Sequence, residues 1–125
     1  MNARPWRALI VLACLALSLT SLGAGAQEVP VVTGEHWTNS GPDHKKAYLL
    51  GIANLLQVEL AYFGGNPPPD TQSFIPRMAR GLRGETVDSV RDAVDRWYAA
   101  NPARLSRPVL DVIWVEVVVP GLRKP

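Results

Sequence analysis

The hydrophobic pattern predicts one long helix over residues 45–63. After Lys46, polar side chains interrupt this stretch only at Asn54, Gln57 and Glu59. At 100° per residue, Asn54 and Gln57 fall on one side, and apolar residues cover most of the remaining surface. This pattern is typical of a central helix that packs against neighbours on more than one side.

Both ends of this helix carry their own signals. Ser40 is a suitable N-cap, Pro42 fits the first turn, and Asp43 lies three residues after Ser40, as in a capping box. At the other end, residues 64–70 combine two glycines with three prolines, which cannot continue a helix. Residues 27–39 have no helical period, so we expect an extended or turning lead-in.

Two shorter helices are expected next. The first follows Ser73, with Pro76 in its first turn and Gly84 at its end, and its apolar edge consists of Phe74, Ile75, Met78 and Leu82. The second follows Thr86 and is ended by Asn101-Pro102. Its apolar stripe consists of Val87, Val90, Val94, Trp97 and Tyr98.

The last element, residues 109–119, has an ambiguous pattern. Seven of its eleven residues are β-branched, which favours a strand. Ser106 followed by Pro108 favours a helix start, and a single strand would have no partner in this chain. We therefore predict a helix here. The expected architecture is a small all-α domain of three to four helices, with an ordered core over about residues 40–120.

The first 26 residues have the pattern of an export signal. Arg4 and Arg7 precede an uncharged stretch over residues 8–19, which is shorter than the ~20 residues that span a membrane as a helix. Ala24-Gly25-Ala26 then resembles the small-residue site of the signal protease. We expect cleavage after Ala26, which gives a periplasmic or secreted chain that begins at Gln27 and has no membrane span.

Two other readings of this segment stay open. A retained membrane anchor would need a longer apolar core. A lipoprotein would use Cys14, which lies in the middle of the apolar stretch and not at its end. The mass of the exported protein distinguishes the three forms.

Composition narrows the function classes for residues 27–125. This length fits one domain. The chain has 13 basic and 11 acidic side chains, and only Arg4 and Arg7 lie in the leader, so the remainder is formally neutral. Net charge therefore gives no reason to expect nucleic-acid binding. Cys14 is the only cysteine, so the mature domain has no disulfide and no thiol for catalysis or zinc.

Short motifs in the three helices match one family. They are residues 47–52 (AYLLGI), Ile75-Pro76 and residues 97–102 (WYAANP), followed by a last helix that ends at Pro120. Over residues 45–120 the chain resembles the periplasmic immunity proteins of the Rap/Tai type, which neutralise amidase toxins delivered by type VI secretion. The resemblance implies a helical fold and a protein partner. The family carries disulfide cysteines near these positions, and this chain lacks them.

Several polar and aromatic residues are candidates for binding. Arg77, Arg80 and Arg83 rise along one edge of the second helix, in a stretch without acidic residues, and could bind an acidic partner or phosphate groups. An ordinary solvated helix edge has the same pattern. Trp37 lies outside the expected helices, where it would be either a loop anchor or an exposed binding residue.

Glu59 breaks the apolar pattern of the long helix. With Ile52 as the centre of the buried face, Glu59 falls about 20° from it, so its carboxylate should be paired, neutral or at a wet opening. Arg91 is the expected partner, and Tyr98 or Trp97 the alternative. The residue would then either fix helix packing or mark a polar site in a cleft.

The sequence favours a non-enzymatic, immunity-like interaction protein of the periplasm. It contains no catalytic motif, and we expect no cofactor and no metal site, because the cluster of Glu35, His36, Asp43 and His44 lacks helical ligand spacing. The alternative is a small enzyme or ligand-binding domain with a polar site around Glu59.

Overall fold

The computed structural model describes residues 28–70 and 72–124, and residues from Val31 onward form one compact unit. The leader and its cleavage site lie outside the described residues. The prediction of an all-α fold is confirmed, because the described part of the chain contains helices and no β-strand. The elements are α2 (Gly34–Thr38), α3 (Pro42–Tyr62), α4 (Ile75–Gly81), α5 (Val87–Ala100), η2 (Pro102–Arg104), α6 (Val109–Ile113), η3 (Trp114–Val118) and α7 (Val119–Gly121).

The last three elements form one continuous helical segment, so the predicted helix over residues 109–119 is confirmed. Its central part, η3, is a π-helix, and Pro108 with φ −61° and ψ 141° is the N-cap of α6. The segment's buried side chains are Val109, Val112, Ile113, Val117 and Val118. Burial against other helices thus outweighs the weak helix propensity of β-branched residues.

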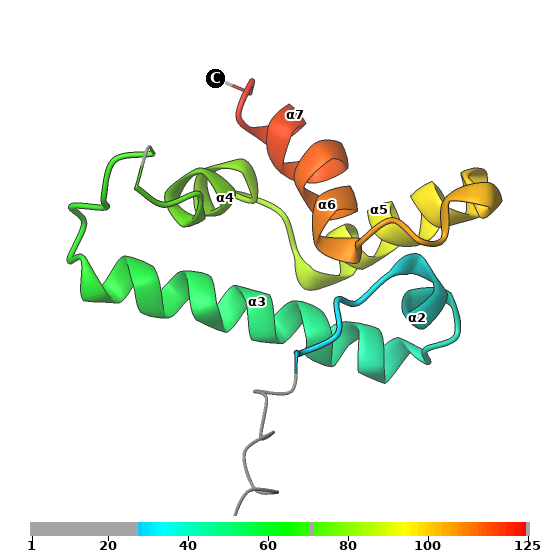
Figure 1. Ribbon diagram of the computed structural model, residues 1–125. Coiled ribbons are helices and arrows are strands. Elements are labelled where there is room, and N and C mark those ends of the chain that lie inside the picture. Colours follow the sequence, from blue (N-terminus) through cyan, green and yellow to red (C-terminus); the bar gives the residue numbers. More distant parts are fainter. Residues whose placement is uncertain (1–27, 71, 125) are drawn as a thin grey trace, which may run out of the picture. The chain divides into compact units, whose positions relative to one another are not determined.

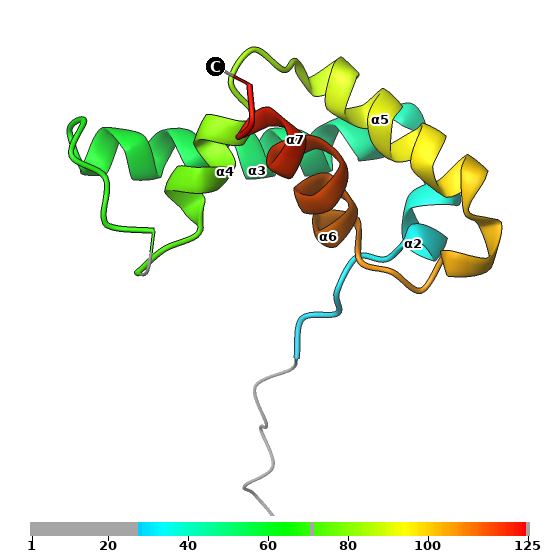
Figure 2. The same ribbon diagram turned by 90° about the horizontal axis from the view of Figure 1, so that it is seen from above.

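The helices form two layers in residues 31–124. α3 lies along one side, and α4, α5 and the segment α6–α7 lie over it, with α6–α7 between α4 and α5 (Figures 1 and 2). The crossing of α4 with α7 depends on glycine, because a Cβ atom at Gly121 would overlap the carbonyl oxygen of Gly81. The core between the layers is formed by Trp37, Leu49, Leu56, Met78, Val90, Val94, Tyr98 and the buried residues of α6–η3.

Two expectations for residues 27–43 were wrong. Residues 34–38, expected to be extended, form helix α2, which is too short to have a visible period. Ser40 does not cap α3, because its hydroxyl donates to the carbonyl oxygen of His36 (2.7 Å) and Gly41 is the N-cap. The cap expected at Thr86 is confirmed, since its hydroxyl accepts from the Ser89 N–H (3.0 Å). The helix end expected at Gly84 was wrong, because α4 ends at Gly81 with Leu82 as its C-cap, and Gly84, with φ +84°, belongs to the turn that follows.

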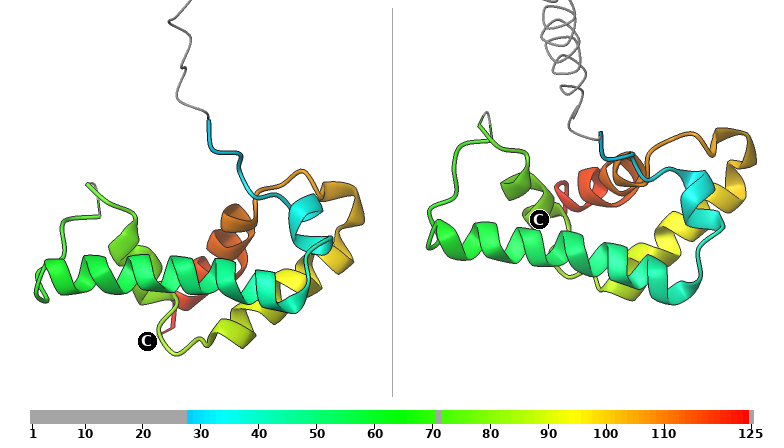
Figure 3. Two further views of the ribbon diagram at one scale, coloured as in Figure 1. Left: turned by 90° about the horizontal axis from the view of Figure 1, so that it is seen from below. Right: turned by 60° about the horizontal axis from the view of Figure 1, so that its bottom comes forward.

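The expectation that α3 packs on more than one side was also wrong. Only Leu49 and Leu56 of this 21-residue helix are buried. Seen from below, α3 lies in front of the other helices, and none of residues 31–70 and 72–124 covers its outer side (Figure 3). The apolar residues on that side are therefore exposed to solvent.

The start of the unit is bound to its C-terminal third. Gly34 N–H donates to the Arg107 carbonyl oxygen, and Val109 N–H donates to that of Val32 (3.1 and 2.9 Å). Tyr98 lies beneath this contact, where its hydroxyl donates to the same Arg107 oxygen (2.8 Å) and its ring leaves no room for a Cβ atom at Gly34.

Burial raises the pKa of Tyr98 to about 12, which predicts a loss of stability in alkali. An unfolded tyrosine ionises near pH 10, so Tyr98 stabilises the fold fully below that pH, and the contribution is lost as the pH rises towards 12. Urea unfolding at pH 8 and pH 11 should show this decline in wild type and a smaller one in Tyr98→Phe. A Tyr98→Phe variant that declines as steeply as wild type would contradict the assignment.

Candidate functional site

Trp37 is a core residue and not an exposed binding residue. Its side chain is 2% exposed, and its indole N–H donates to Asp95 Oδ1 (2.7 Å). Lys45 pairs with the same oxygen (2.9 Å) and lies 5.4 Å from the centre of the Trp37 ring, while Tyr48 meets the ring edge-on. This network joins α2, α3 and α5, so Trp37 cannot contact a partner in the folded protein.

Glu59 and Arg91 do not form the expected pair. Both side chains are half-buried, but Arg91 binds Asp88 and Asp92 of its own helix (both 2.8 Å). These two carboxylates raise the pKa of Arg91, and the hydrogen bonds that Arg91 donates to Asp92 are the main cause. Glu59 lies at the edge of the buried face, because that face is centred on Leu49 and Leu56 and not on Ile52. It lines neither of the two grooves described below.

The three arginines near α4 have different surroundings. Arg80 pairs with Asp70 (2.9 Å), which ties the end of the proline-rich loop to α4. Arg83 is exposed beside Lys124 and Leu122. Arg77 is half-buried, and it forms no ion pair or hydrogen bond within the described residues. The predicted basic edge is thus divided, because Arg77 lines one groove, whereas Arg80 and Arg83 line a separate hollow beside the C-terminal segment.

The groove that contains Arg77 lies between α4 and α6–η3 and encloses about 610 Å³. The guanidinium carbon of Arg77 is 5.3 Å from the centre of the Trp114 ring, and Phe74 meets that ring edge-on at 6.0 Å. We call this site the arginine groove; it is lined by Val31, Phe74, Arg77, Met78, Pro108, Leu110, Asp111 and Trp114. Sequence reasoning found Arg77 but missed the aromatic residues, although Phe74 precedes it by three positions and so shares its helix face.

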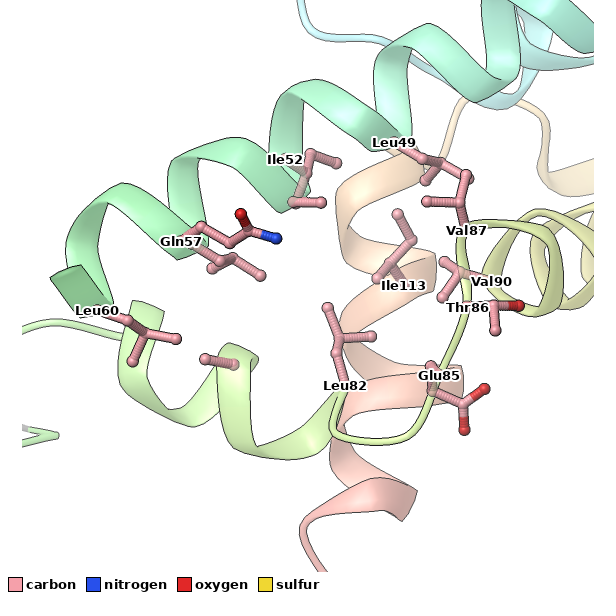
Figure 4. Close-up of a pocket in the computed structure, with 13 residues that line it drawn as sticks. Leu49, Ile52, Gln57, Leu60, Leu82, Glu85, Thr86, Val87, Val90 and Ile113 are labelled. Carbon is pink, nitrogen blue, oxygen red and sulfur yellow. The ribbon is translucent and has the colours of Figure 1, made fainter. Parts of the chain in front are cut away.

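A second groove lies between α3, α4 and the start of α5 and encloses about 220 Å³ (Figure 4). Its walls are mostly aliphatic, with Leu49, Ile52 and Leu60 from α3 facing Leu82, Val87 and Val90. Gln57 and Glu85 supply its amide and charged groups; the Gln57 amide points from α3 towards the groove, whereas the Glu85 carboxylate points away from it (Figure 4). Apolar surfaces of this size can accept a small side chain, but the groove presents few groups that would orient a ligand.

The Glu85 carboxylate beside this groove has partners of its own. The Ser89 hydroxyl donates to Oε2 (2.8 Å) and Lys124 approaches Oε1 (3.4 Å). The hydrogen bond from Ser89 is the main cause that lowers the pKa of Glu85, and Lys124 adds to it. Glu85 therefore stabilises the junction of α4, α5 and the C-terminus at neutral pH, and this contribution is lost as the pH falls through its lowered pKa.

The outer face of α3 carries several large apolar side chains that no described residue covers. Leu50, Leu55, Val58 and Tyr62 are 42, 57, 67 and 82% exposed. Ala47, Gly51 and Ala61 lie between them, and Asn54 is the polar residue of this face. We use the term outer face for these eight residues. The sequence signal was present, since the apolar pattern extends around the helix, but it was assigned to the protein's own core.

No family model, curated protein or solved structure matches this chain. Within residues 28–70 and 72–124, no three His, Cys, Asp or Glu side chains lie close enough together to hold a metal ion. In the same residues, no helix combines the length and apolar character that a membrane span requires. The two grooves and the outer face of α3 are thus the candidate sites.

Proposed function

We propose that this chain is an exported, non-enzymatic protein that acts in the periplasm by binding another protein through the outer face of α3. The exposure of Leu55, Val58 and Tyr62 on one helix face carries the proposal. Full burial of one such side chain contributes about 1.5–3 kcal/mol, so this face favours association. The leader pattern and the resemblance to Rap/Tai immunity proteins support the compartment and the type of partner.

The area of the outer face indicates what kind of partner fits. The face extends over residues 47–62, which is about 22 Å at 1.5 Å per residue, on a helix about 10 Å wide. A second copy that packed only helix against helix would cover roughly 200–400 Å² per chain, and a stable interface needs about 800 Å². A partner with an apolar groove surrounds the helix on three sides and reaches that area. We therefore propose that the partner is a different protein with such a groove.

The spacing of the exposed apolar residues on α3 also matches that of helices which bind in the groove of a partner. Leu55, Val58 and Tyr62 have the spacing i, i+3 and i+7, which places their side chains in one row. Gly51 stands beside this row with open space around it, so the backbone of a partner can approach closely there.

The double substitution Leu55→Asp with Val58→Asp tests the proposal. We expect it to change the free energy of unfolding by less than about 1 kcal/mol, because both side chains are exposed. The neighbouring substitution Leu56→Ala should cost about 2–5 kcal/mol, because Leu56 is buried. Partner binding should weaken at least a hundredfold in the double variant, since two apolar contacts become charged.

Binding is best measured after site-specific photo-cross-linking at residue 58 in producing cells. The adduct's mass identifies the partner, which is then purified and titrated against wild type, the double variant and Gln72→Glu, a charge control on an exposed residue away from α3. An adduct of two copies of this chain, or the absence of an adduct, would overturn the proposal. Equal affinity of the double variant and wild type would do the same.

A further inference from the structure

The arginine groove lies between α4 and α6–η3, away from the outer face of α3, and its lining differs from that face because it includes charged side chains. Phe74, Leu110 and Val31 are 46, 37 and 62% exposed around it. Its volume of about 610 Å³ lies within the range of ligand sites, about 300–1,000 Å³. The groove therefore combines exposed apolar side chains with the charged side chains Arg77 and Asp111.

The donors of Arg77 are unused. Its Nε–H is shielded from solvent and has no acceptor among the described residues. Packing of the guanidinium on Trp114 holds its plane in place. Burial of this donor without an acceptor costs free energy. A carboxylate in the groove would form charge-assisted hydrogen bonds with the terminal N–H groups of the same guanidinium, which have no acceptor among the described residues either. Arg80, Arg91 and Arg107, by contrast, already bind carboxylates of the chain.

Two classes of ligand with a carboxylate are peptides and fatty acids, and the surroundings of Asp111 favour a peptide. Its Oδ2 accepts from Arg107 Nε, and its Oδ1 has no donor among the described residues. The groove thus offers cationic donors at Arg77 and an acceptor at Asp111. A peptide supplies both a carboxylate and backbone N–H donors, whereas a fatty acid supplies no donor for the free oxygen of Asp111.

The short distances within the groove favour the end of a peptide chain. The Arg77 guanidinium carbon and the Phe74 ring centre lie 5.3 and 6.0 Å from the centre of the Trp114 ring, which is less than the length of two extended residues. Only the last residue of a chain carries a carboxylate and a side chain on the same Cα atom. We propose that the arginine groove binds the free C-terminus of a peptide or protein whose last residue is large and apolar, with the carboxylate on Arg77 and the side chain on Phe74 and Trp114.

The test uses the exported, purified protein and the probe peptide acetyl-Ala-Leu-Phe. Nitrogen–proton NMR spectra should show shifts of the Arg77 Nε–H and the Trp114 indole N–H as the free-acid peptide is added. The same peptide with a C-terminal amide should bind ten- to hundredfold more weakly, because it lacks the charged acceptor. Dodecanoate should bind more weakly than the free-acid peptide.

Two variants provide matched controls. Arg77→Met keeps the apolar stem over Trp114 and should lose tenfold or more in affinity for the free acid, while Arg83→Met, an exposed arginine beyond the end of α4, should bind as wild type. If Arg77→Met fails to fold, the acid-to-amide ratio in wild type decides alone. Equal binding of acid and amide, tighter binding of dodecanoate, or no shifts up to about 5 mM peptide would overturn the proposal.

Discussion

Gly81→Ala is expected to lower the free energy of unfolding by about 3 kcal/mol or more, a large part of the stability of a domain this small. The added Cβ atom would lie 2.5 Å from the Val118 carbonyl oxygen and 2.9 Å from Val118 Cα. Both are backbone atoms, so the strain is relieved only if α4 moves away from η3. The gain in helix propensity, about 1 kcal/mol, does not offset this displacement.

Gly51→Ala is the matched control, and its effect on the free energy of unfolding should have the opposite sign. Gly51 lies within α3 with no atom within 4 Å of the position of a new Cβ atom. Alanine there should raise the free energy of unfolding by about 0.5–1 kcal/mol. Urea unfolding of the two variants under the same conditions measures both effects. Similar changes in the two variants would mean that α4 and η3 are not in close contact.

Trp37→Ala should destabilise the protein by about 3–5 kcal/mol. The side chain fills the space between α2, α3 and α5, and its indole N–H binds Asp95. A five-residue helix such as α2 has no stability of its own, so it depends on this anchor. Guanidinium unfolding measures the loss, and near-ultraviolet circular dichroism reports the loss of ring packing.

Trp37→Phe separates packing from the hydrogen bond. It should cost less than Trp37→Ala, because a ring remains and Asp95 keeps its bond to Lys45. Tyr62→Ala provides an aromatic control on the surface, since Tyr62 is 82% exposed and contacts Phe63 edge-on. Its expected cost is at most about 1 kcal/mol. A cost for Tyr62→Ala as large as that for Trp37→Ala would contradict the described burial.

Local signals in the sequence were enough to predict most helices. The N-cap Thr86, Pro76 in a first turn and the glycines and prolines after residue 63 act within a few residues, so their effect on the backbone can be read directly. Helix α2 escaped prediction because five residues contain little more than one turn of periodicity. Residues 109–119 were predicted as a helix mainly because a single strand would have had no partner strand in this chain.

The sites were harder to predict, because their residues meet only in the folded chain. The contact of Trp37 with Asp95 spans 58 residues, and Arg77 meets Trp114 across the boundary between two helices. The pattern of α3 could not reveal which apolar side faces the protein's own core, since both sides have the same composition. The prediction centred the buried face of α3 on Ile52 instead of Leu49, which is an error of about 60° around the helix axis. This error placed Glu59 at the centre of the buried face instead of at its edge.

The hydrogen bonds between residues 32–35 and residues 105–109 affect when this protein can fold. These partners are about seventy or more positions apart, so α2 cannot dock until residues 105–109 have left the ribosome. Contacts of such long range form late, after the intervening loop has closed. If the proposed export precedes folding, the domain can close only after residues 105–109 have crossed the membrane.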